Sequence, residues 1–362
     1  MKSHTGDDWR DFGFTTGMAA AAATTAALEY LLTAVSPSQV TIDTPDARRR
    51  LTIEIERAGR AAGGAAASVI KKAGPDRDVT DGLVVEARVI PNELGRVRVF
   101  GGPGVGTVTL PGLATALGRP AINPTPLAHI EKIALTALAG GADVMVAAPG
   151  GVRLAAKTFN PRLGIVGGIS ILGTSGLVRP MSLTAWRSAL LPQLDQAKAL
   201  GHPLVAMTFG NLGASAAVDK LNLPATAIVQ MGNFAGYMIR AGADRDLDMI
   251  VIGHLGKVIK LASGYENTHH LETPDRLALL TEFVNAISPE SGKRIIELPS
   301  AEAAAAFLAA ADPAILNSVA DKTRDFLQRL APKRRTGALI TNLAGDIIGA
   351  EPEALAMMAG LS

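Results

Sequence analysis

The chain has 362 residues, 48% hydrophobic and only 4% aromatic, with a formal net charge of +2 at pH 7. This length favours two domains over a single core, and the balanced charge gives no support for binding to nucleic acid. The absence of cysteine excludes a disulfide framework, a thiolate nucleophile and a cysteine-ligated zinc site.

An alanine-rich segment begins after Gly17, and we expect a helix that ends near Thr33. Thr15 or Thr16 can cap it, and its free N–H groups can hold a carboxylate or phosphate, although a capped helix without a ligand is the alternative. A signal peptide is disfavoured because acidic residues precede the segment, at Asp7, Asp8 and Asp11. No window has the ~18 uninterrupted apolar residues of a membrane span. We therefore expect a cytoplasmic protein that does not bind membranes.

Several short elements follow in the first half of the chain. Alternating apolar and polar residues predict an antiparallel hairpin over Val40–Asp43 and Leu51–Glu56. Alanine content predicts a short helix over Ala62–Lys72, followed by a polar loop over Asp76–Gly82. Further strands are expected at Leu83–Ile90, Arg96–Phe100 and Val144–Ala147, with a helix over His129–Ala139.

Two loops lie between these elements. The Gly-x-Gly-x-Gly spacing within Gly101–Thr109 suggests a dinucleotide loop, but such a loop must open a helix. Here Val108, Thr109 and Pro111 follow, so we expect a ligand-facing loop between strands. The prolines of Ala121–Pro126 each favour an extended residue before them, including Asn123.

The run from Lys157 to Pro180 interrupts apolar, β-branched residues with paired glycines. It ends in a loop whose N–H groups and hydroxyls, on Thr174 and Ser175, suit an anionic or polar ligand. Basic residues flank it at Lys157, Arg162 and Arg179. Each can be an ordinary surface residue, but their clustering and the match of arginine to carboxylates favour a polycarboxylate site.

The segment Pro203–His270 reads as strand, glycine loop and helix three times. The strands are Leu204–Thr208, Ala227–Gln230 and Met249–Ile252. This alternation predicts a parallel sheet whose loops share the carboxyl edge, where such sheets bind ligands. We expect a set of polar residues to converge on one crevice there: Asn211, Asn233, His254, Lys257, Asn267 and His269.

Helices are expected over Pro180–Ala199, Leu277–Ala286, Ala301–Ala311 and Pro313–Leu330. A basic loop at Lys333–Arg335 precedes a final hairpin around Gly345. The predicted fold class is α/β, with a mixed α+β N-terminal domain over residues 1–199 and a Rossmann-like parallel-sheet domain over residues 200–362.

Several reaction classes find little support. There is no Gly-x-Ser-x-Gly elbow, no His-Glu-x-x-His zinc motif, and Val258 follows Lys257 where a phosphate loop needs a hydroxyl. An adenosyl or NAD site usually has an acid after the second strand. Here Gln230–Asn233 contains none, so amide side chains and glycine N–H groups would have to hold such a cofactor.

Several motifs share one pattern: Phe14–Gly17, Gly104–Thr109 with Pro111–Leu113, Pro120–Pro124, Thr158–Thr174, Gly253–Lys257, Lys260–Ala262 and Asn267–His269, over about residues 12–275. This pattern resembles one family, the cobalt-precorrin-5B C(1)-methyltransferases of cobalamin biosynthesis. The resemblance implies methyl transfer from S-adenosylmethionine to C1 of a corrinoid precursor, giving cobalt-precorrin-6A. The cobalt would be carried by this small-molecule substrate, and no metal site on the protein is expected.

The resemblance and the residues together predict three groups of site residues. The methyl donor is expected at Gly210, Asn211, Gly232, Asn233, Gly253 and Gly256. The carboxylate-rich macrocycle is expected at Thr15, Thr16, Arg119, Asn123, Lys157, Arg162, Thr174, Ser175, Arg179, Lys257 and Asn267. His254 or His269 would transfer a proton or contact the cobalt. The pocket is expected between the 203–270 sheet and the 101–180 loops.

The chain departs from the family pattern at three places. Leu110 and the Thr125–Leu127 segment stand where basic residues are expected, and Met18 replaces a small residue or cysteine. Either Arg119 compensates for the missing charge, or the substrate contacts differ. The alternatives to a methyltransferase are a nucleotide-dependent oxidoreductase and a non-catalytic corrinoid carrier. The oligomeric state stays open, with a homodimer as one option.

Overall fold

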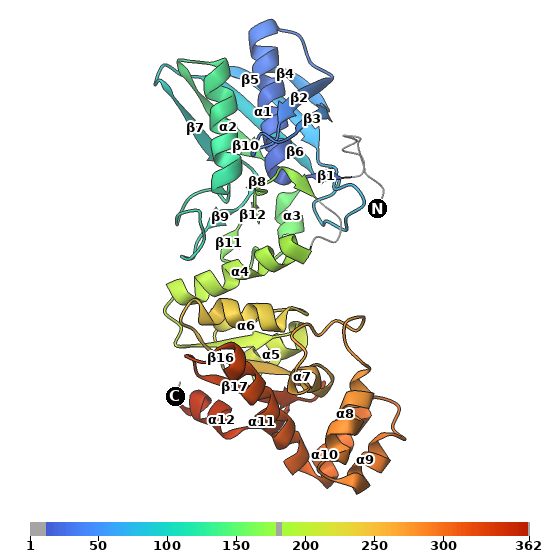
Figure 1. The fold of residues 1–362 in the computed structure, drawn as a ribbon. Helices are drawn as coiled ribbons and strands as arrows, with labels where there is room; N and C mark the ends of the chain where they lie inside the picture. The colour runs from blue at the N-terminus through green and yellow to red at the C-terminus, as the bar shows by residue number, and fades with distance from the viewer. Residues whose placement is uncertain (1–11, 179–182, 361–362) are drawn as a thin grey trace. The chain divides into compact units, whose positions relative to one another are not determined.

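The computed structural model describes residues 12–178 and 183–360. The chain divides into two compact units, Met1–Ser182 and Leu183–Ser362, here called unit 1 and unit 2. Figure 1 shows several small sheets and helices in the first unit, and one sheet with helices around it in the second. The helix α4, Leu183–Ala199, belongs to unit 2.

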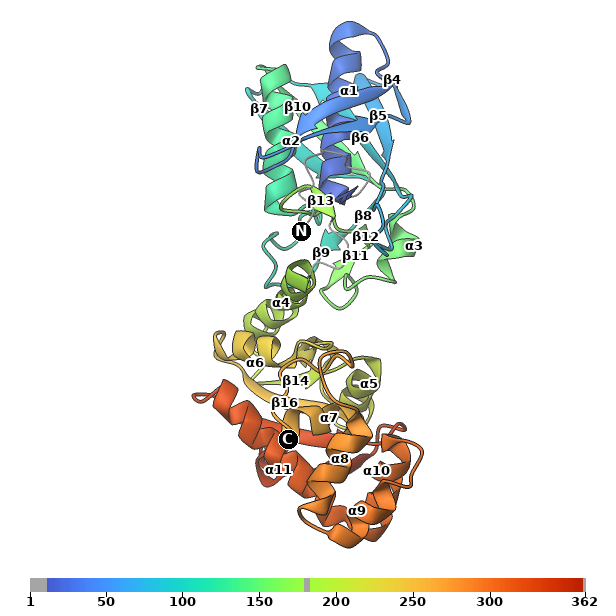
Figure 2. The same cartoon turned by 45° about the vertical axis from the view of Figure 1, so that its right-hand side comes forward.

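Unit 1 is built on a five-stranded sheet that packs against two helices. The strand order is β4 (Arg57–Ala61), β5 (Gly64–Ile70), β6 (Val84–Pro91), β10 (Gly141–Ala147) and β7 (Arg96–Gly101). Neighbours are antiparallel except β10 and β7, which are parallel. Helices α1 (Thr16–Thr33) and α2 (Pro124–Ala137) pack together against the sheet, as Figure 2 shows. The predicted hairpin is confirmed as β2 (Gln39–Asp43) and β3 (Arg50–Glu54).

The helix expected over Ala62–Lys72 is wrong, because this segment holds strand β5 and the turn before it. Gly63 adopts a φ of 78°, which turns the chain from β4 into β5. Ala65, Ala67 and Val69 alternate on the buried side of β5, which packs against α1. Alanine's preference for helix is weak, and packing against the alanines of α1 overrides it here.

Helix α2 begins earlier than expected. The helix was predicted from His129, and the residue before each proline was predicted to be extended. Asn123 is extended as predicted, with a ψ of 156°, but α2 begins directly after it at Pro124 and includes Thr125. Proline fits the first helical turn because its fixed φ is helical and its missing N–H has no intrahelical partner to lose.

Short strands join the loops of unit 1 to one another. Strand β8 (Gly104–Val105) pairs in parallel with β12 (Gly168–Ile169), and β9 (Thr107–Val108) pairs antiparallel with β11 (Ile165–Val166). A third pair joins β1 (Gly13–Phe14) to β13 (Leu177–Val178). The short helix α3 (Gly151–Ala155) follows β10 and lies against β12. The two glycine-rich runs of the sequence therefore fold against each other.

Unit 2 contains the predicted parallel sheet. The order is β15 (Ile228–Gln230), β14 (Leu204–Thr208), β16 (Asp248–His254), β17 (Thr336–Thr341) and β18 (Ile347–Ala350). The first four strands are parallel, and β18 forms the predicted hairpin with β17. The strand–loop–helix alternation is confirmed by α5 (Asn211–Asp219), α6 (Ala235–Ala243) and α7 (Leu255–Ala262). The α/β fold class is thus confirmed.

The remaining helices cover one part of unit 2. They are α8 (Arg276–Asn285), α9 (Pro289–Ile295), α10 (Ala301–Ala311), α11 (Pro313–Leu330) and α12 (Pro352–Ala359). Helices α9 and α12 were not predicted from the sequence. Within the described residues no single helix has the length and apolar character to cross a membrane; α10 and α11, bent by 117° at their junction, reach those limits only as a pair.

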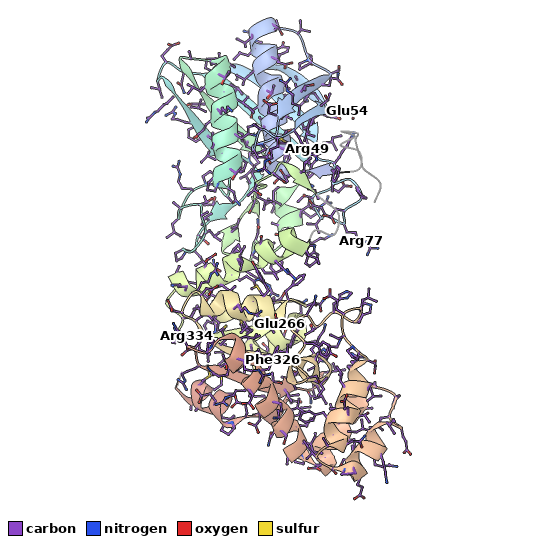
Figure 3. All side chains as sticks on the ribbon, viewed as in Figure 1. Arg49, Glu54, Arg77, Glu266, Phe326 and Arg334 are labelled. Atoms are coloured by element: carbon purple, nitrogen blue, oxygen red, sulfur yellow. The ribbon has the colours of Figure 1, made fainter. Side chains whose placement is uncertain are left out.

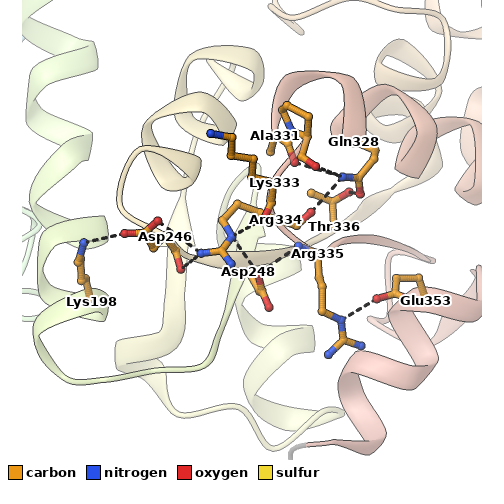
Figure 4. Close-up of polar contacts among 11 residues, drawn as sticks. Lys198, Asp246, Asp248, Gln328, Ala331, Lys333, Arg334, Arg335, Thr336 and Glu353 are labelled. Carbon is orange, nitrogen blue, oxygen red and sulfur yellow. Dashed lines mark hydrogen bonds and ion pairs between the residues drawn. The ribbon is translucent and has the colours of Figure 1, made fainter.

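The basic loop Lys333–Arg335 is tied to acidic residues at the start of strand β16. Arg334 lies 3.6 Å from a carboxylate oxygen of Asp246 and 3.4 Å from one of Asp248. Arg335 pairs with Glu353 at 2.7 Å (Figure 4). These contacts lie at the amino end of the parallel strands, opposite the edge that was expected to bind ligands.

Candidate functional site

Four parallel strands of unit 2 end at one edge of the sheet. Their last residues are Thr208, Gln230, His254 and Thr341. Strand β14 lies in the middle, with the next strand in sequence, β15, on one side and β16 on the other. The chain therefore changes direction across the sheet between β14 and β16, which is where open α/β sheets form ligand crevices.

Lys257 contacts one other expected site residue, Asn233, at this edge. Its Nζ atom donates to Oδ1 of Asn233 at 2.7 Å and to the main-chain carbonyl of Thr268 at 3.1 Å. Lys260 is 5% exposed, and its Nζ donates to the same carbonyl, also at 3.1 Å. The described parts of the chain place no carboxylate within ion-pair distance of either ammonium group. The positive charge is held by neutral acceptors.

Burial shifts the ionisation of this pair. The pKa of Lys257 falls from 10.5 to about 8, mainly because burial disfavours the charged form, with added repulsion from Lys260 and Arg276. The pKa of Lys260 is also lowered, again mainly by burial and then by Arg276. Both lysines would gain stability from a bound anion that supplied the missing negative charge.

His254 lies at the side of a separate cavity. It is the last residue of β16 and the residue before α7, and it lines a cavity of about 320 Å³ together with residues of α10 and of the β17–β18 turn. Its Nδ1 atom is buried and has no hydrogen-bond partner in the described structure. Burial lowers the pKa of His254, so its imidazole is neutral at pH 7.

The other expected polar residues make local contacts. Asn211 accepts from the side chain of Gln230 at 3.0 Å, which links the loops after β14 and β15. Asn267 donates to Glu272 at 2.7 Å and accepts from the main-chain N–H of His269 at 3.0 Å. The structure therefore brings Asn233 together with Lys257. His254 instead lines the cavity beside α10 and the β17–β18 turn.

The glycines expected near the methyl donor fall into two kinds. A Cβ atom built on Gly210 or on Gly232 meets no other atom within 4 Å, so the backbone of both is open to a ligand. A Cβ on Gly253 would lie 2.6 Å from the ring of Phe209, and one on Gly256 would lie 2.8 Å from Arg276. The last two glycines are therefore explained by packing within the protein.

The glycine loop at Gly101–Thr109 does not present its glycines to a ligand, which corrects the expectation from the sequence. A Cβ on Gly104 would lie 1.7 Å from the carbonyl oxygen of Ala148, and one on Gly168 would lie 2.1 Å from the carbonyl oxygen of Gly104. Distances this short have no room for any side chain. The glycines allow backbone to pack on backbone.

The hydroxyls of Thr15 and Thr16 are engaged inside unit 1. Thr15 caps α1 by accepting from the N–H of Met18 at 3.2 Å. Thr16 donates to the carbonyl of Ser170 at 3.1 Å and accepts from the N–H of Leu172 at 2.9 Å. Both residues are buried. Through Thr16, the start of α1 is hydrogen-bonded to the segment 170–172.

The other expected substrate residues of unit 1 are exposed, namely Arg119, Asn123, Lys157, Arg162, Thr174 and Ser175. Arg119 and Arg162 flank the β9–β11 pair: the carbonyl of Arg119 accepts from Val108. Arg179 lies outside the described residues. Leu110 stands at a position where a basic residue was expected. Its side chain packs over Gly164, so it makes an apolar contact in this chain.

The chain matches one family model and a group of named relatives. A family model described as CbiD matches residues 3–180. A Cobalt-precorrin-5B C(1)-methyltransferase of Desulfitobacterium hafniense is 41% identical over 84% of this chain and 80% of its own length. One from Moorella thermoacetica is 37% identical over 96% of both chains. The chain belongs to the CbiD family. A solved structure titled as the cobalamin biosynthesis protein (cbiD) of Archaeoglobus fulgidus is 28% identical, covering 70% of this chain and 80% of its own, with a TM-score of 0.40.

Membership of the CbiD family confirms the resemblance found in the sequence motifs. The structure adds residues that were not predicted as site residues, chiefly Lys260, Thr268 and Glu302. Lys260 and Thr268 were visible only as parts of the Lys260–Ala262 and Asn267–His269 motifs, and the burial of Lys260 is a tertiary property. Among the described residues no three histidine or acidic side chains gather as a set that could hold a metal ion.

Proposed function

We propose that this chain transfers a methyl group from S-adenosylmethionine to C1 of cobalt-precorrin-5B in cobalamin biosynthesis. The observation that carries the proposal is the 37% identity, over 96% of both chains, to a protein named Cobalt-precorrin-5B C(1)-methyltransferase. That name specifies a corrinoid acceptor and a methyl transfer. S-adenosylmethionine is the finer step of the proposal, because its sulfonium sulfur makes the methyl group a good electrophile.

The chemistry requires alignment more than covalent catalysis. The carbon at C1 attacks the methyl carbon, the carbon–sulfur bond breaks, and the electron pair returns to sulfur. Holding the two reactants in line supplies up to about 7–11 kcal/mol of the barrier reduction in well-oriented reactions. The protein therefore has to bind two partners and exclude water, and the cobalt enters as part of the substrate.

Unit 2 supplies groups that suit the methyl donor. The open backbones of Gly210 and Gly232 follow strands β14 and β15, and Asn211 and Asn233 stand beside them. A nucleoside or amino-acid group can approach these loops closely and receive hydrogen bonds from main-chain and amide groups. The carboxylate of the donor would pair with the ammonium group of Lys257, whose Nζ atom lies 2.7 Å from Oδ1 of Asn233.

Unit 1 supplies groups that suit a substrate rich in carboxylates. Lys157, Arg162 and Arg119 are exposed at the loops around β9 and β11. Guanidinium groups bind carboxylates through paired hydrogen bonds. With Leu110 packed over Gly164, Arg119 is the residue that we propose compensates for the missing charge. Thr15 and Thr16 shape this region through internal hydrogen bonds and are not assigned to the substrate.

His254 and His269 are the proposed candidates for proton transfer or contact with the cobalt. The neutral imidazole of His254 has an unpartnered Nδ1. The Nδ1 atom of His269 accepts from the N–H of Leu271 at 3.3 Å, which leaves its other ring nitrogen to interact with a ligand.

The proposal is tested first by binding and then by turnover. Titration calorimetry with S-adenosylhomocysteine should give saturable binding, and NADH should give none. The titration is repeated with cobyrinic acid, a cobalt corrinoid with free carboxylates, in case the donor site forms only with a corrinoid bound. Incubation with cobalt-precorrin-5B and methyl-labelled S-adenosylmethionine should then move the label into the corrinoid. NADH binding alone would support an oxidoreductase, and corrinoid binding without label transfer would support a carrier.

A further inference from the structure

The cavity beside His254 is lined mainly by apolar side chains. Ala305, Ala306 and Ala309 of α10 line it together with Leu343 and Ile348 of the β17–β18 hairpin. Alanine side chains leave a smooth surface on a helix, so a planar ring can lie against it. The cavity opens at the carboxyl ends of β16 and β17, the ligand-binding edge of this sheet.

Its size decides which partner can enter. Small-molecule sites in proteins range from about 300 to 1,000 Å³, and this cavity measures about 320 Å³. A tetrapyrrole macrocycle with its acidic side chains is too large for that space. A group of the size of a nucleoside fits it, which leaves the methyl donor as the matching partner in the reaction.

Two polar side chains stand at the wall of this apolar space. Glu302, in the first turn of α10, lies 3.4 Å from the guanidinium of Arg276, and its side chain is 29% exposed. A carboxylate in such a position accepts hydrogen bonds from neighbouring hydroxyls, as an acid does for ribose in dinucleotide sites. His254 lines the same space, where its imidazole can hydrogen-bond a polar group of the ligand.

We propose that this cavity binds the nucleoside part of the methyl donor, with Glu302 accepting from the ribose hydroxyls, His254 bonding the polar edge of the purine, and the ring lying on the alanines of α10. This inference rests on the proposed function. Glu302, on helix α10, would supply the acidic residue that the loop after β15 lacks, although the two are distant in sequence. The open loop at Gly210, on the neighbouring strand β14, then faces the amino-acid end of the same donor.

Two substitutions test the cavity, each with a matched control. Ala306→Phe fills the space from an exposed position of α10, and Ala310→Phe makes the same change on the same helix at an exposed residue outside the cavity wall. Glu302→Gln removes the charge while keeping the shape, and Glu297→Gln is its exposed control. Binding of S-adenosylhomocysteine is measured by calorimetry, with and without cobyrinic acid, and thermal melting reports folding.

We expect Ala306→Phe and Glu302→Gln each to weaken binding by about ten-fold or more. Ala306→Phe fills the space that the ligand would occupy, and Glu302→Gln removes a charge-assisted hydrogen bond. Both controls should bind like the wild type. Wild-type preference for adenosine over 2′-deoxyadenosine as a competitor should disappear in Glu302→Gln. If Ala306→Phe does not fold, Glu302→Gln decides the outcome.

Failure of the cavity and failure of the function give different results. Unchanged affinity in both cavity variants, with methyl transfer intact in the wild type, would overturn the cavity as the donor site and leave the methyltransferase standing. Absence of both donor binding and methyl transfer in the wild type, with and without corrinoid, would overturn the proposed function and this inference with it.

Discussion

Lys257 and Lys260 donate to one acceptor: the Nζ atom of each lies 3.1 Å from the main-chain carbonyl oxygen of Thr268. Two like charges this close repel each other, and burial adds a cost for each. Neither ammonium has a carboxylate partner among residues 12–178 and 183–360. The fold therefore holds positive charge without a carboxylate in contact at the carboxyl edge of the sheet, as a site for an anionic ligand does.

The pH dependence of stability should report the ionisation of Lys257. Its pKa is about 8 in the folded protein and 10.5 without the fold. Between these values the unfolded chain binds more protons than the folded chain, so the free energy of unfolding rises with pH. The rise is at most about 1.4 kcal/mol per pH unit, and partial exposure reduces it.

The measurement is urea denaturation of the wild type and Lys257→Met from about pH 7.5 to about 10.5. The difference in unfolding free energy between the two proteins should grow in favour of the wild type as the pH rises. Lysines that do not interact with Lys257 titrate alike in both proteins, and their contribution cancels in the difference. A constant difference across this range would contradict the shifted pKa.

Gly104→Ala should prevent unit 1 from folding. Its Cβ would lie 1.7 Å from the carbonyl oxygen of Ala148, and its φ of 79° also disfavours a side chain. Gly167→Ala is the matched control: its φ is 84°, but its Cβ meets nothing within 4 Å. We expect a cost of about 1–2 kcal/mol for the control and soluble, protease-resistant protein from the control alone. Equal behaviour of the two would show that the glycine packing is not required.

Overpacking α1 should destabilise unit 1. Ala26 is fully buried in this helix, which packs against β5 and β6. Ala26→Leu should lower the free energy of unfolding by about 1–3 kcal/mol, as extra methylenes do in a tight core. Glu29→Leu, at an exposed position of the same helix, should change it by less than about 0.5 kcal/mol. Hydrogen exchange of α1 amides measures both.

Exposed cations of unit 1 should control corrinoid binding. Lys157→Met and Arg162→Met should each raise the KM for cobalt-precorrin-5B by about three- to ten-fold, as expected for partly screened charge pairs. The effect should shrink at high salt. Arg77→Met, on an outer loop of the same unit (Figure 3), is the charge-matched control and should leave the KM unchanged. A similar rise in the control would indicate a general effect of net charge.

His254→Ala should lower kcat/KM for the methyl donor by about ten-fold or more, because a buried polar group that meets the ligand is lost. The split between kcat and KM separates its two proposed roles. A rise in the donor KM alone indicates binding in the cavity, whereas a fall in kcat with an altered pH profile indicates proton transfer. Unchanged turnover and unchanged KM would reject both roles.

Much of unit 2 could be predicted because its signals are local. Short apolar strands, glycine loops and amphipathic helices alternate along 203–262, and each is recognisable within a few residues. The convergence of loops at one edge follows from parallel pairing. The grouping of side chains did not follow: Asn233 meets Lys257, while His254 lines a cavity with Glu302. Side-chain direction depends on packing that sequence spacing does not describe.

The sequence by itself determined the family, the α/β class and the order of most elements, because these depend on residue identity and on local periodicity. Only the tertiary structure decided that the segment 64–70 is a strand, since the alanines of α1 select it. It also decided which glycines are open, as Gly210 is, and which pack on backbone, as Gly104 does. The physical reason is shared by both cases. Whether a small residue is needed depends on the atoms that face it, and those atoms come from distant parts of the chain.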